Sequence, residues 1–284
     1  MLDYRQARKT GICLESLRGE ALDTVYVVDN SGDTAHSREL TATLESLRSQ
    51  DIGFRIEQLG TGENLGFAAG VNLAIETDLG SQAPHDRYLL INNDAIAEPG
   101  LVACLQQALQ PDSGICVAAP GIVSAAAGTE YTLSYNRYLG LLTRRATPFS
   151  FQYASGCCLL VDRSALEGDR LFDPDFFMYC EDACLCWRLQ REGRTVSVAE
   201  EARVYHEAGA SSRKAGLFYE YHTARGHVLM AFKVYRHPLE IPLMLVCRLA
   251  SLSLRSLNRC IRYRSLVPAW AFLLAWYPAS IRVN

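Results

Sequence analysis

Apolar and polar positions along the first 120 residues predict strands and helices in turn. Residues 24–28 and 88–91 are short apolar runs, typical of buried strands, and 54–59 alternates between apolar and polar side chains. Residues 65–75 have the apolar spacing of a helix, and Pro99 marks the start of another. This βαβα order predicts an α/β fold with a mostly parallel, Rossmann-like central sheet covered by helices on both faces.

The rest of the chain has a less regular pattern. Residues 121–152 resemble a loop or an insertion, and 153–161 have the composition of one buried strand. Two apolar stretches follow, 241–254 and 266–277, and Arg248 lies inside the first. Each is shorter than the roughly 20 residues that span a bilayer. We therefore expect helices that lie on a surface rather than cross a membrane.

Charge separates the two parts of the chain. The net charge of −3 hides 11 Lys/Arg against 2 Asp/Glu in residues 213–284, and 17 against 29 in residues 1–212. A basic tail favours an anionic partner, and its aromatic residues lie within apolar runs, which favours a membrane interface over nucleic acid. The alternative is a helical hairpin packed on the body or at a homodimer interface. We expect an α/β domain at 1–212 and a basic amphipathic helical region at 213–284.

Cysteine usage bears on the compartment. The chain has ten cysteines and no apolar signal segment near its first residue, which favours a reducing cytoplasm over a disulfide framework. Cys180, Cys184 and Cys186 are close in sequence, but their spacing is poor for a metal. We expect them to pack inside a helix.

Carboxylates follow two predicted strands, where ligands of such sheets bind. Asp29 ends the first strand and Asp94 follows the later one. Asn92, Asn93 and Asp94 offer the hard oxygen ligands that Mg²⁺ or Mn²⁺ prefers, although such a triplet is also a common turn. His206 follows a strand-like segment, and a lone histidine is more often structural than a metal ligand.

An acidic pair opens a helix farther along the chain. Glu181 and Asp182 follow the aromatic-rich segment 172–178. A carboxylate that faces a cleft can accept the proton of an attacking hydroxyl group. The pair would also interact favourably with the helix dipole, at about 0.3–1 kcal/mol. The two roles are compatible because they can use different oxygen atoms.

The glycine-rich segment 62–72 opens the helix after the third strand. Its glycines lack the dinucleotide-binding spacing, so NAD is rejected. Glycines at a helix start allow nucleotide phosphates or ribose to approach closely. A simple helix cap would not account for both Asn64 and Asn72.

These motifs together resemble the family 2 glycosyltransferases of the GT-A fold, especially the bacterial rhamnosyltransferase-like branch. The most specific match is Asn-Leu-Gly-Phe-Ala-x-Gly-x-Asn at 64–72, and Val-Asp-Asn-Ser lies at 28–31. His-x-x-Gly-x-Ser occupies 206–211, and Glu181 begins a Glu-Asp-x-x-Leu-x-x-Arg motif. The resemblance covers about residues 3–212.

The resemblance implies a role for each residue. Asp182 would be the catalytic base, and Asp94, His206 and Asn92 would hold Mg²⁺ or Mn²⁺. Asp29 would accept the imide N–H that uracil and thymine share. The implied donor-binding residues are Tyr4, Asp29, Asn64, Gly66, Asn72, Asn93 and Arg225.

The chain departs from the family pattern at several points. Asn92 and Cys184 replace aspartates, and the strand that should precede Tyr4 is nearly absent. The Tyr-x-x-Arg-Asn motif is shifted by one residue around Arg225 and loses its asparagine. These departures keep a non-catalytic membrane-associated partner with the same fold as an alternative. A sugar-phosphate nucleotidyltransferase is less compatible, because residues 1–17 contain only Gly11 and no basic glycine-rich phosphate loop.

The resemblance therefore predicts an inverting, metal-dependent glycosyltransferase. The donor would be dTDP-rhamnose or a UDP-sugar, and the acceptor a glycan or a lipid-linked glycan in cell-surface polysaccharide synthesis. We expect a cytoplasmic protein, peripheral on the inner face of the cytoplasmic membrane.

Overall fold

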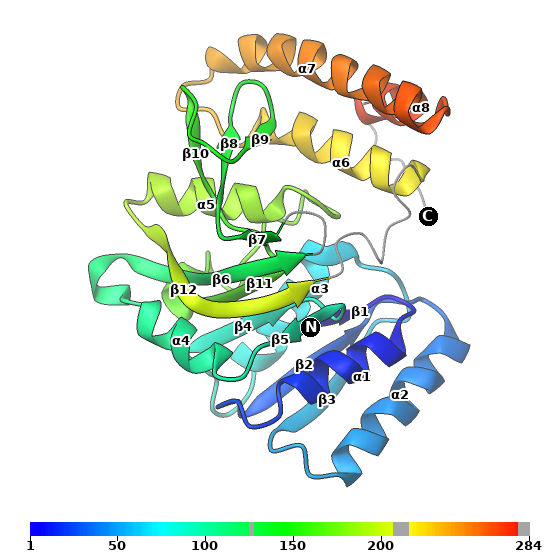
Figure 1. The fold of residues 1–284 in the computed structure, drawn as a ribbon, viewed down its shortest axis with the longest axis vertical. Coiled ribbons are helices and arrows are strands. Elements are labelled where there is room, and N and C mark those ends of the chain that lie inside the picture. The colour runs from blue at the N-terminus through cyan, green and yellow to red at the C-terminus, as the bar shows by residue number, and fades with distance from the viewer. Residues whose placement is uncertain (125–127, 207–215, 278–284) are drawn as a thin grey trace.

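The computed structural model describes residues 1–124, 128–206 and 216–277. Strands and helices alternate along the first part of the chain, as the apolar periodicity predicts (Figure 1). The elements are β1 (Leu2–Asp3), α1 (Ala7–Ser16), β2 (Thr24–Asp29), α2 (Thr34–Ser49), β3 (Arg55–Gly60), α3 (Gly66–Leu79), β4 (Arg87–Ile91), β5 (Ala95–Ala97) and α4 (Leu101–Ala108). The short 3₁₀ helix η1 (Pro111–Ser113) follows α4.

The α/β architecture is confirmed, and the strands form a divided sheet. One part is parallel, with the order β1-β2-β3, and the other has the order β4-β11-β6-β12-β5. This second part contains β6 (Ile115–Ser124), β11 (Cys158–Asp162) and β12 (Thr195–His206), and β7 (Gly128–Glu130) pairs with β6. Strands β11 and β5 run antiparallel to their neighbours, which the sequence did not predict.

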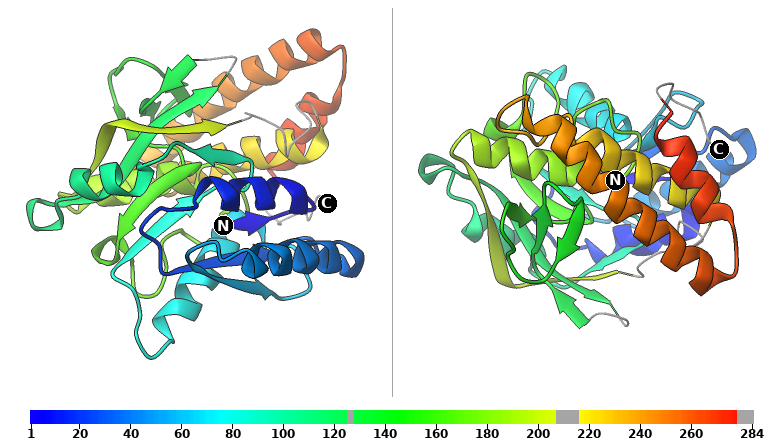
Figure 2. Two further views of the ribbon diagram at one scale, coloured as in Figure 1. Left: turned by 60° about the horizontal axis from the view of Figure 1, so that its bottom comes forward. Right: turned by 90° about the horizontal axis from the view of Figure 1, so that it is seen from above.

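Helices cover both faces of the larger sheet. Successive residues of a strand point to opposite faces of the sheet, so Leu159 and Leu160 of β11 belong to different cores. The core around Leu159 contains α3 and α5 (Glu181–Arg191), and the core around Leu160 contains α1 and α4. Figure 2 shows these layers from two further sides.

The middle of the chain differs from the expected loop and single strand. Residues 133–153 contain β8 (Leu133–Asn136), β9 (Leu141–Thr143) and β10 (Ser150–Tyr153), which form a small antiparallel sheet. The predicted strand at 153–161 is therefore two strands, β10 and β11, in different sheets. They are separated because the link between them turns inward, where the Gly156 amide donates a hydrogen bond to Asp182. The 3₁₀ helix η2 (Arg163–Ala165) follows β11.

Three C-terminal helices cover the side of the body that carries α5. They are α6 (Leu217–Met230), α7 (Glu240–Tyr263) and α8 (Val267–Ala275), with α7 and α8 outermost (Figures 1 and 2). In the described part of the chain, no helix is both long and apolar enough to cross a membrane. Arg248 of α7 points inward and is fully buried.

Candidate functional site

Asp182 lies in the first turn of α5, where its carboxylate is buried and held by three donors. Its Oδ2 accepts hydrogen bonds from the Tyr153 hydroxyl at 2.8 Å and the Gly156 amide at 2.9 Å. Its Oδ1 accepts from the Ala183 amide at 2.8 Å. A side chain at position 156 would meet Asp182, since a Cβ there would lie 3.5 Å from Oδ2. No role was assigned to Tyr153 or Gly156 from the sequence.

Glu181 and Asp182 form a buried acidic pair with unequal environments. The two residues are 5% and 8% exposed. Burial raises the pKa of both, and the pKa of Glu181 is raised well above its usual range by burial and by the charge of Asp182. Oε2 of Glu181 has no hydrogen-bond partner, whereas three donors stabilise the Asp182 carboxylate. We infer that the pair shares one negative charge, which resides on Asp182 while Glu181 keeps its proton.

A strained turn leads into this acidic pair. Tyr179 and Cys180 both have left-handed φ angles, 68° and 74°, which are uncommon for residues other than glycine. Helix α6 packs directly on the turn, where a Cβ at Gly226 would lie 2.6 Å from the Tyr179 carbonyl oxygen. Nδ1 of His227 lies 3.6 Å from Sγ of Cys180. Helix α6 therefore holds the backbone that presents Asp182.

Arg248 connects α7 to the same region. Its guanidinium donates to the carbonyl of His227, to the carbonyl of Arg137 at 2.6 Å and to the Tyr135 hydroxyl at 3.1 Å. The Tyr135 hydroxyl lies 2.9 Å from Nδ1 of His227. Burial and the Arg248 charge lower the pKa of His227 to about 3, so its imidazole is neutral.

Asp94 and His206 come together at the end of the sheet. Asp94 follows β4, His206 ends β12, and the pairing of His206 with Ala95 in β5 brings the two side chains side by side. Nε2 of His206 lies 3.1 Å from Oδ1 of Asp94. The rest of the predicted His-x-x-Gly-x-Ser pattern, at 207–211, lies outside the described residues.

Asp94 and His206 suit a divalent metal ion whose remaining ligands come from a bound substrate. In the described part of the chain, no group of three or more His, Cys, Asp or Glu residues could hold a metal ion. Mg²⁺ and Mn²⁺ bound with nucleotides use one or two carboxylates and take substrate phosphates as further ligands. One carboxylate and one imidazole match that pattern, with Asn92 as a neighbouring oxygen source. We conclude that the residues present fit such an ion.

One short segment joins the acidic pair to the Asp94 loop. The Gly156 amide donates to Asp182, and the next carbonyl, that of Cys157, accepts from the Asn92 amide at 2.8 Å. Phe67 at the start of α3 packs against the same segment, since a Cβ at position 156 would lie 3.6 Å from its ring. The predicted base, metal site and glycine-rich helix therefore converge on residues 156–157.

Asp29 lies in a separate, half-open pocket of about 390 Å³. The pocket is lined by the loop after β2, the first turn of α2 and the end of β3. Oδ1 of Asp29 accepts from the Ser31 hydroxyl at 2.6 Å and from the Ser31 amide at 3.0 Å. Burial would raise the pKa of Asp29, but these hydrogen bonds outweigh it and lower the pKa overall. An ionised carboxylate thus lines this pocket, and its role in reading a donor base stays a prediction.

The glycine-rich motif is tied to the loop after Asp29. The Asn30 side chain accepts from the Leu65 amide at 2.8 Å and donates to the Gly66 carbonyl at 3.0 Å. Oδ1 of Asn64 accepts a hydrogen bond from the Gly66 amide at 2.9 Å and closes a turn just before the helix. Gly66 has φ +80° and a Cβ there would lie 2.3 Å from the Phe177 carbonyl oxygen. This glycine is required because the backbone before α5 approaches so closely.

The other predicted donor-binding residues have different surroundings. Asn72 is buried and makes three hydrogen bonds to the backbone of Leu171 and Phe172, 2.9–3.1 Å long. The side-chain amide of Asn93 donates a hydrogen bond to the Thr10 hydroxyl at 3.0 Å. Arg225 donates to the carbonyls at 275 and 277, and Tyr4 is 40% exposed. The structure thus joins Asn64 and Gly66 to the Asp29 loop, and the binding roles of all these residues stay predictions.

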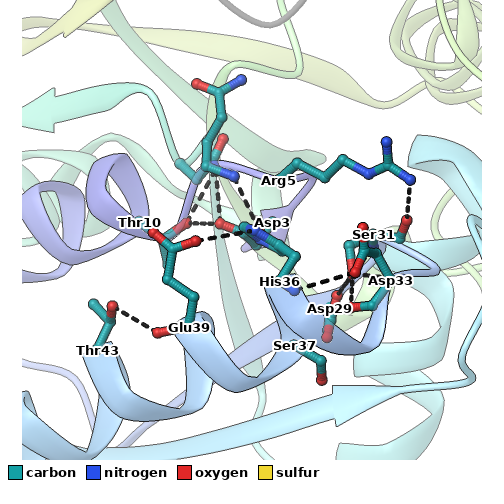
Figure 3. A network of polar contacts seen from close by, with 12 residues as sticks. Asp3, Arg5, Thr10, Asp29, Ser31, Asp33, His36, Ser37, Glu39 and Thr43 are labelled. Carbon is teal, nitrogen blue, oxygen red and sulfur yellow. Dashed lines mark hydrogen bonds and ion pairs between the residues drawn. The ribbon is translucent and has the colours of Figure 1, made fainter.

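A buried network of polar side chains lies at the end of β1 (Figure 3). The sequence did not predict it. Asp3 is fully buried, accepts from the Thr10 hydroxyl and lies 2.6 Å from Nε2 of His36. The Asn93 side chain also reaches Asp3, at 3.4 Å. The network therefore binds β1, α1 and α2 to the loop that carries Asp94. Its only sequence signal is a strand-end aspartate.

Comparison by sequence finds no relative: no protein-family model and no curated protein matches this chain. Solved structures do share its fold. A mannosyltransferase from Pyrobaculum calidifontis, in complex with GDP-Man and Mn²⁺, has a TM-score of 0.58 at 14% identity, covering 96% of this chain and 82% of its own. GalNAc-T7 with UDP, GalNAc and Mn²⁺ has a TM-score of 0.54 at 13% identity, covering 74% of this chain. This chain spans only 41% of GalNAc-T7. At these identities the likeness concerns the fold, and it confirms the predicted GT-A architecture.

Proposed function

We propose that this chain is an inverting glycosyltransferase that uses a divalent metal and a nucleotide-diphosphate sugar. The observation that carries the proposal is the convergence of Asp182 and the Asp94–His206 pair on residues 156–157, at the carboxyl edge of a GT-A sheet. Two proteins of the same fold are solved with a sugar nucleotide or nucleotide and Mn²⁺. By resemblance, the donor is dTDP-rhamnose or a UDP-sugar and the acceptor a glycan or lipid-linked glycan of cell-surface polysaccharide synthesis, as in family 2 and its rhamnosyltransferase-like branch.

Asp182 is suited to act as the general base of this reaction. The acceptor hydroxyl would give its proton to the carboxylate as the oxygen attacks the anomeric carbon. Tyr153 and the Gly156 amide fix the orientation of the carboxylate, and the protonated Glu181 avoids a second negative charge beside it. Asp29 would accept the imide N–H of a uracil or thymine base in its pocket.

Asp94 and His206 would hold Mg²⁺ or Mn²⁺, with Asn92 beside them. The ion, when bound, supplies Lewis-acid stabilisation to the departing diphosphate. The His206 imidazole would supply a nitrogen ligand and the Asp94 carboxylate an oxygen ligand.

Calorimetry with UDP and dTDP, with and without Mn²⁺, tests the proposal. We expect metal-dependent binding to the folded chain, weakened at least tenfold in Asp94→Asn and in His206→Ala. Asp182→Asn is the matched control, because it should keep nucleotide binding and lose sugar transfer. If the folded chain binds neither nucleotide, the transferase proposal is wrong and the non-catalytic alternative is favoured.

We also propose that α7 and α8 attach the protein to an anionic membrane, at the inner face of the cytoplasmic membrane. Both helices and the residues at their ends expose apolar side chains mostly three or four residues apart, so each presents an apolar stripe. The exposed arginines Arg236, Arg262 and Arg264 flank the stripes. The stripe residues are Leu239, Leu243, Val246, Leu249, Leu254, Leu257, Ile261, Leu266, Trp270, Leu273 and Tyr277.

Sedimentation with phosphatidylglycerol vesicles tests this attachment. The wild-type chain should co-sediment, and the double variant Leu257→Glu/Trp270→Glu should stay in the supernatant. Ile96→Glu is the matched control, because Ile96 is 45% exposed on β5, in a different part of the molecule. If the wild-type chain binds no vesicles but forms a dimer, and the double variant is a monomer, the stripes serve self-association instead.

A further inference from the structure

The turn between β8 and β9 exposes large apolar side chains. Leu139 lies in the turn, Leu141 and Leu142 begin β9, and each of the three is more than a third exposed. Phe149, directly before β10, is 64% exposed, and the ring of Tyr138 meets it edge-on at 5.0 Å between centroids. We call these five residues the hairpin tip.

The backbone of this turn has its hydrogen-bond partners within the protein. The amides of Tyr138 and Leu139 donate to Oδ1 of Asn136 at 3.1 and 2.9 Å, and the Gly140 amide donates to the Asn136 carbonyl at 2.8 Å. The Leu139 carbonyl accepts from the Ser251 hydroxyl of α7 at 2.6 Å. Backbone polar groups must be satisfied internally where a segment enters hydrocarbon, and these four groups meet that condition.

The charge around the hairpin tip has one sign. Residues 131–153 contain no Asp or Glu, and Arg144 and Arg145 are exposed between Leu142 and Phe149. Arg144 also pairs with Glu130 of β7 at 3.1 Å. Apolar side chains next to arginines suit an anionic lipid surface, because the apolar groups enter the membrane while the guanidinium groups stay among the headgroups.

The hairpin tip lies beside the helices of the proposed membrane attachment. The guanidinium of Arg248 donates to the Arg137 carbonyl at 2.6 Å, and Ser251 holds Leu139, so α7 supports the turn at two points. The turn reaches the level of α7 in Figure 1, and Figure 2 shows β8 and β9 on one side of α7 and α8 on the other. Three elements that are distant in sequence therefore expose apolar side chains around one helix.

The backbone at Phe149 is strained. Its φ angle of 64° lies in the left-handed region, which is an outlier for a bulky side chain. The Phe149 carbonyl accepts from the Arg137 amide at 3.1 Å, which ties this conformation to the turn. Strain of this kind is found at sites where function requires the conformation, and here it presents a phenylalanine to the solvent.

We propose that the hairpin tip inserts into an anionic membrane beside α7 and α8, as a third contact that fixes the orientation of the molecule. This inference rests on the proposed membrane attachment of α7 and α8. Strand β10 follows Phe149 directly and ends at Tyr153, whose hydroxyl donates to Asp182. The four residues from Phe149 to Tyr153 span at most about 14 Å, so insertion holds the proposed base close to the lipid surface.

Sedimentation of Leu139→Glu/Leu142→Glu with phosphatidylglycerol vesicles tests the proposal. We expect its affinity for the vesicles to be at least tenfold below that of the wild type, because two negative charges would face an anionic surface. Ile96→Glu/Gln152→Glu is the matched control, since it adds the same charge at exposed positions outside the tip and should bind as the wild type does.

The outcomes separate this inference from the attachment through α7 and α8. If Leu257→Glu/Trp270→Glu loses vesicle binding while Leu139→Glu/Leu142→Glu binds as tightly as the wild type, only the role of the hairpin tip is wrong. If the wild-type chain binds no vesicles, both proposals are wrong.

Hydrogen exchange of the wild-type chain gives a second readout that needs no variant. Exchange in peptides that cover residues 138–149 should slow at least tenfold with phosphatidylglycerol vesicles and stay unchanged with phosphatidylcholine vesicles. Unchanged exchange in protein that co-sediments with phosphatidylglycerol would overturn the proposal. Exchange that slows with protein concentration alone, without vesicles, would assign the tip to self-association and would also overturn it.

Discussion

Gly226 offers a direct test of how the C-terminal helices hold the turn at Tyr179 and Cys180, just before Asp182. In Gly226→Ala the new Cβ would lie 2.6 Å from the Tyr179 carbonyl oxygen and 3.1 Å from Sγ of Cys180. An ordinary carbon–oxygen contact is about 3.3 Å or longer, so the turn must move by about 0.7 Å. Alanine gains about 1 kcal/mol of helix propensity over glycine, while overpacking costs about 1–3 kcal/mol. The difference is a net loss of up to about 2 kcal/mol in the free energy of unfolding.

The same displacement should reduce turnover, since the turn leads directly to Glu181 and Asp182. A shift of this size at a reacting group is expected to lower kcat on the order of 10- to 100-fold with nucleotide affinity unchanged. Gly80→Ala is the matched control, because its Cβ would make only ordinary contacts, 3.5 Å or longer. Urea unfolding and a transfer assay measure the two effects. A Gly226→Ala chain with wild-type stability and wild-type kcat would refute the reasoning.

Three further predictions concern separate parts of the molecule. Asn72→Leu leaves two buried amides without acceptors, so the free energy of unfolding in urea should fall by about 2–4 kcal/mol. Tyr153→Phe removes a donor that lowers the pKa of Asp182, so the acid limb of the kcat/KM profile should move to higher pH. The Met1 amine has a folded pKa of about 6, below the 8.0 of an unfolded chain, so the unfolded state binds more protons between those values. This difference of about two pKa units corresponds to about 3 kcal/mol of stability, which is present above pH 8 and lost as the pH falls to 6, and N-terminal acetylation should abolish that change in thermal or urea unfolding.

The elements were predictable where the signal is local. Strand β2, strand β4 and helix α3 follow from apolar periodicity, and the start of α5 follows from its acidic pair. Strand β11 was misread because its separation from β10 depends on the link between them, whose Gly156 amide donates to Asp182, 26 residues away. The direction of β5 likewise depends on its pairing with β12, which is distant in sequence.

The site was predictable in its residue types but not in its contacts. A carboxylate after a strand and a histidine after another indicate a metal site, and the structure places Asp94 beside His206. Nothing in the sequence shows that the Asn72 side chain forms hydrogen bonds with the backbone of Phe172, 100 residues away. Arg248 was assigned to an apolar surface stretch, and it is buried because three oxygen atoms from other segments surround its guanidinium.

Arg248 also bears on how the two regions of the chain work together. The outer side of α7 carries the apolar stripe, while Arg248 on its inner side donates to His227, which contacts Cys180 directly before the acidic pair. The neutral imidazole of His227 can occupy this place because burial and the Arg248 charge disfavour its protonation. Helix α7 is therefore connected to the turn before Asp182 through the side chains of Arg248 and His227. The C-terminal helices are thus part of the structure that positions the proposed base.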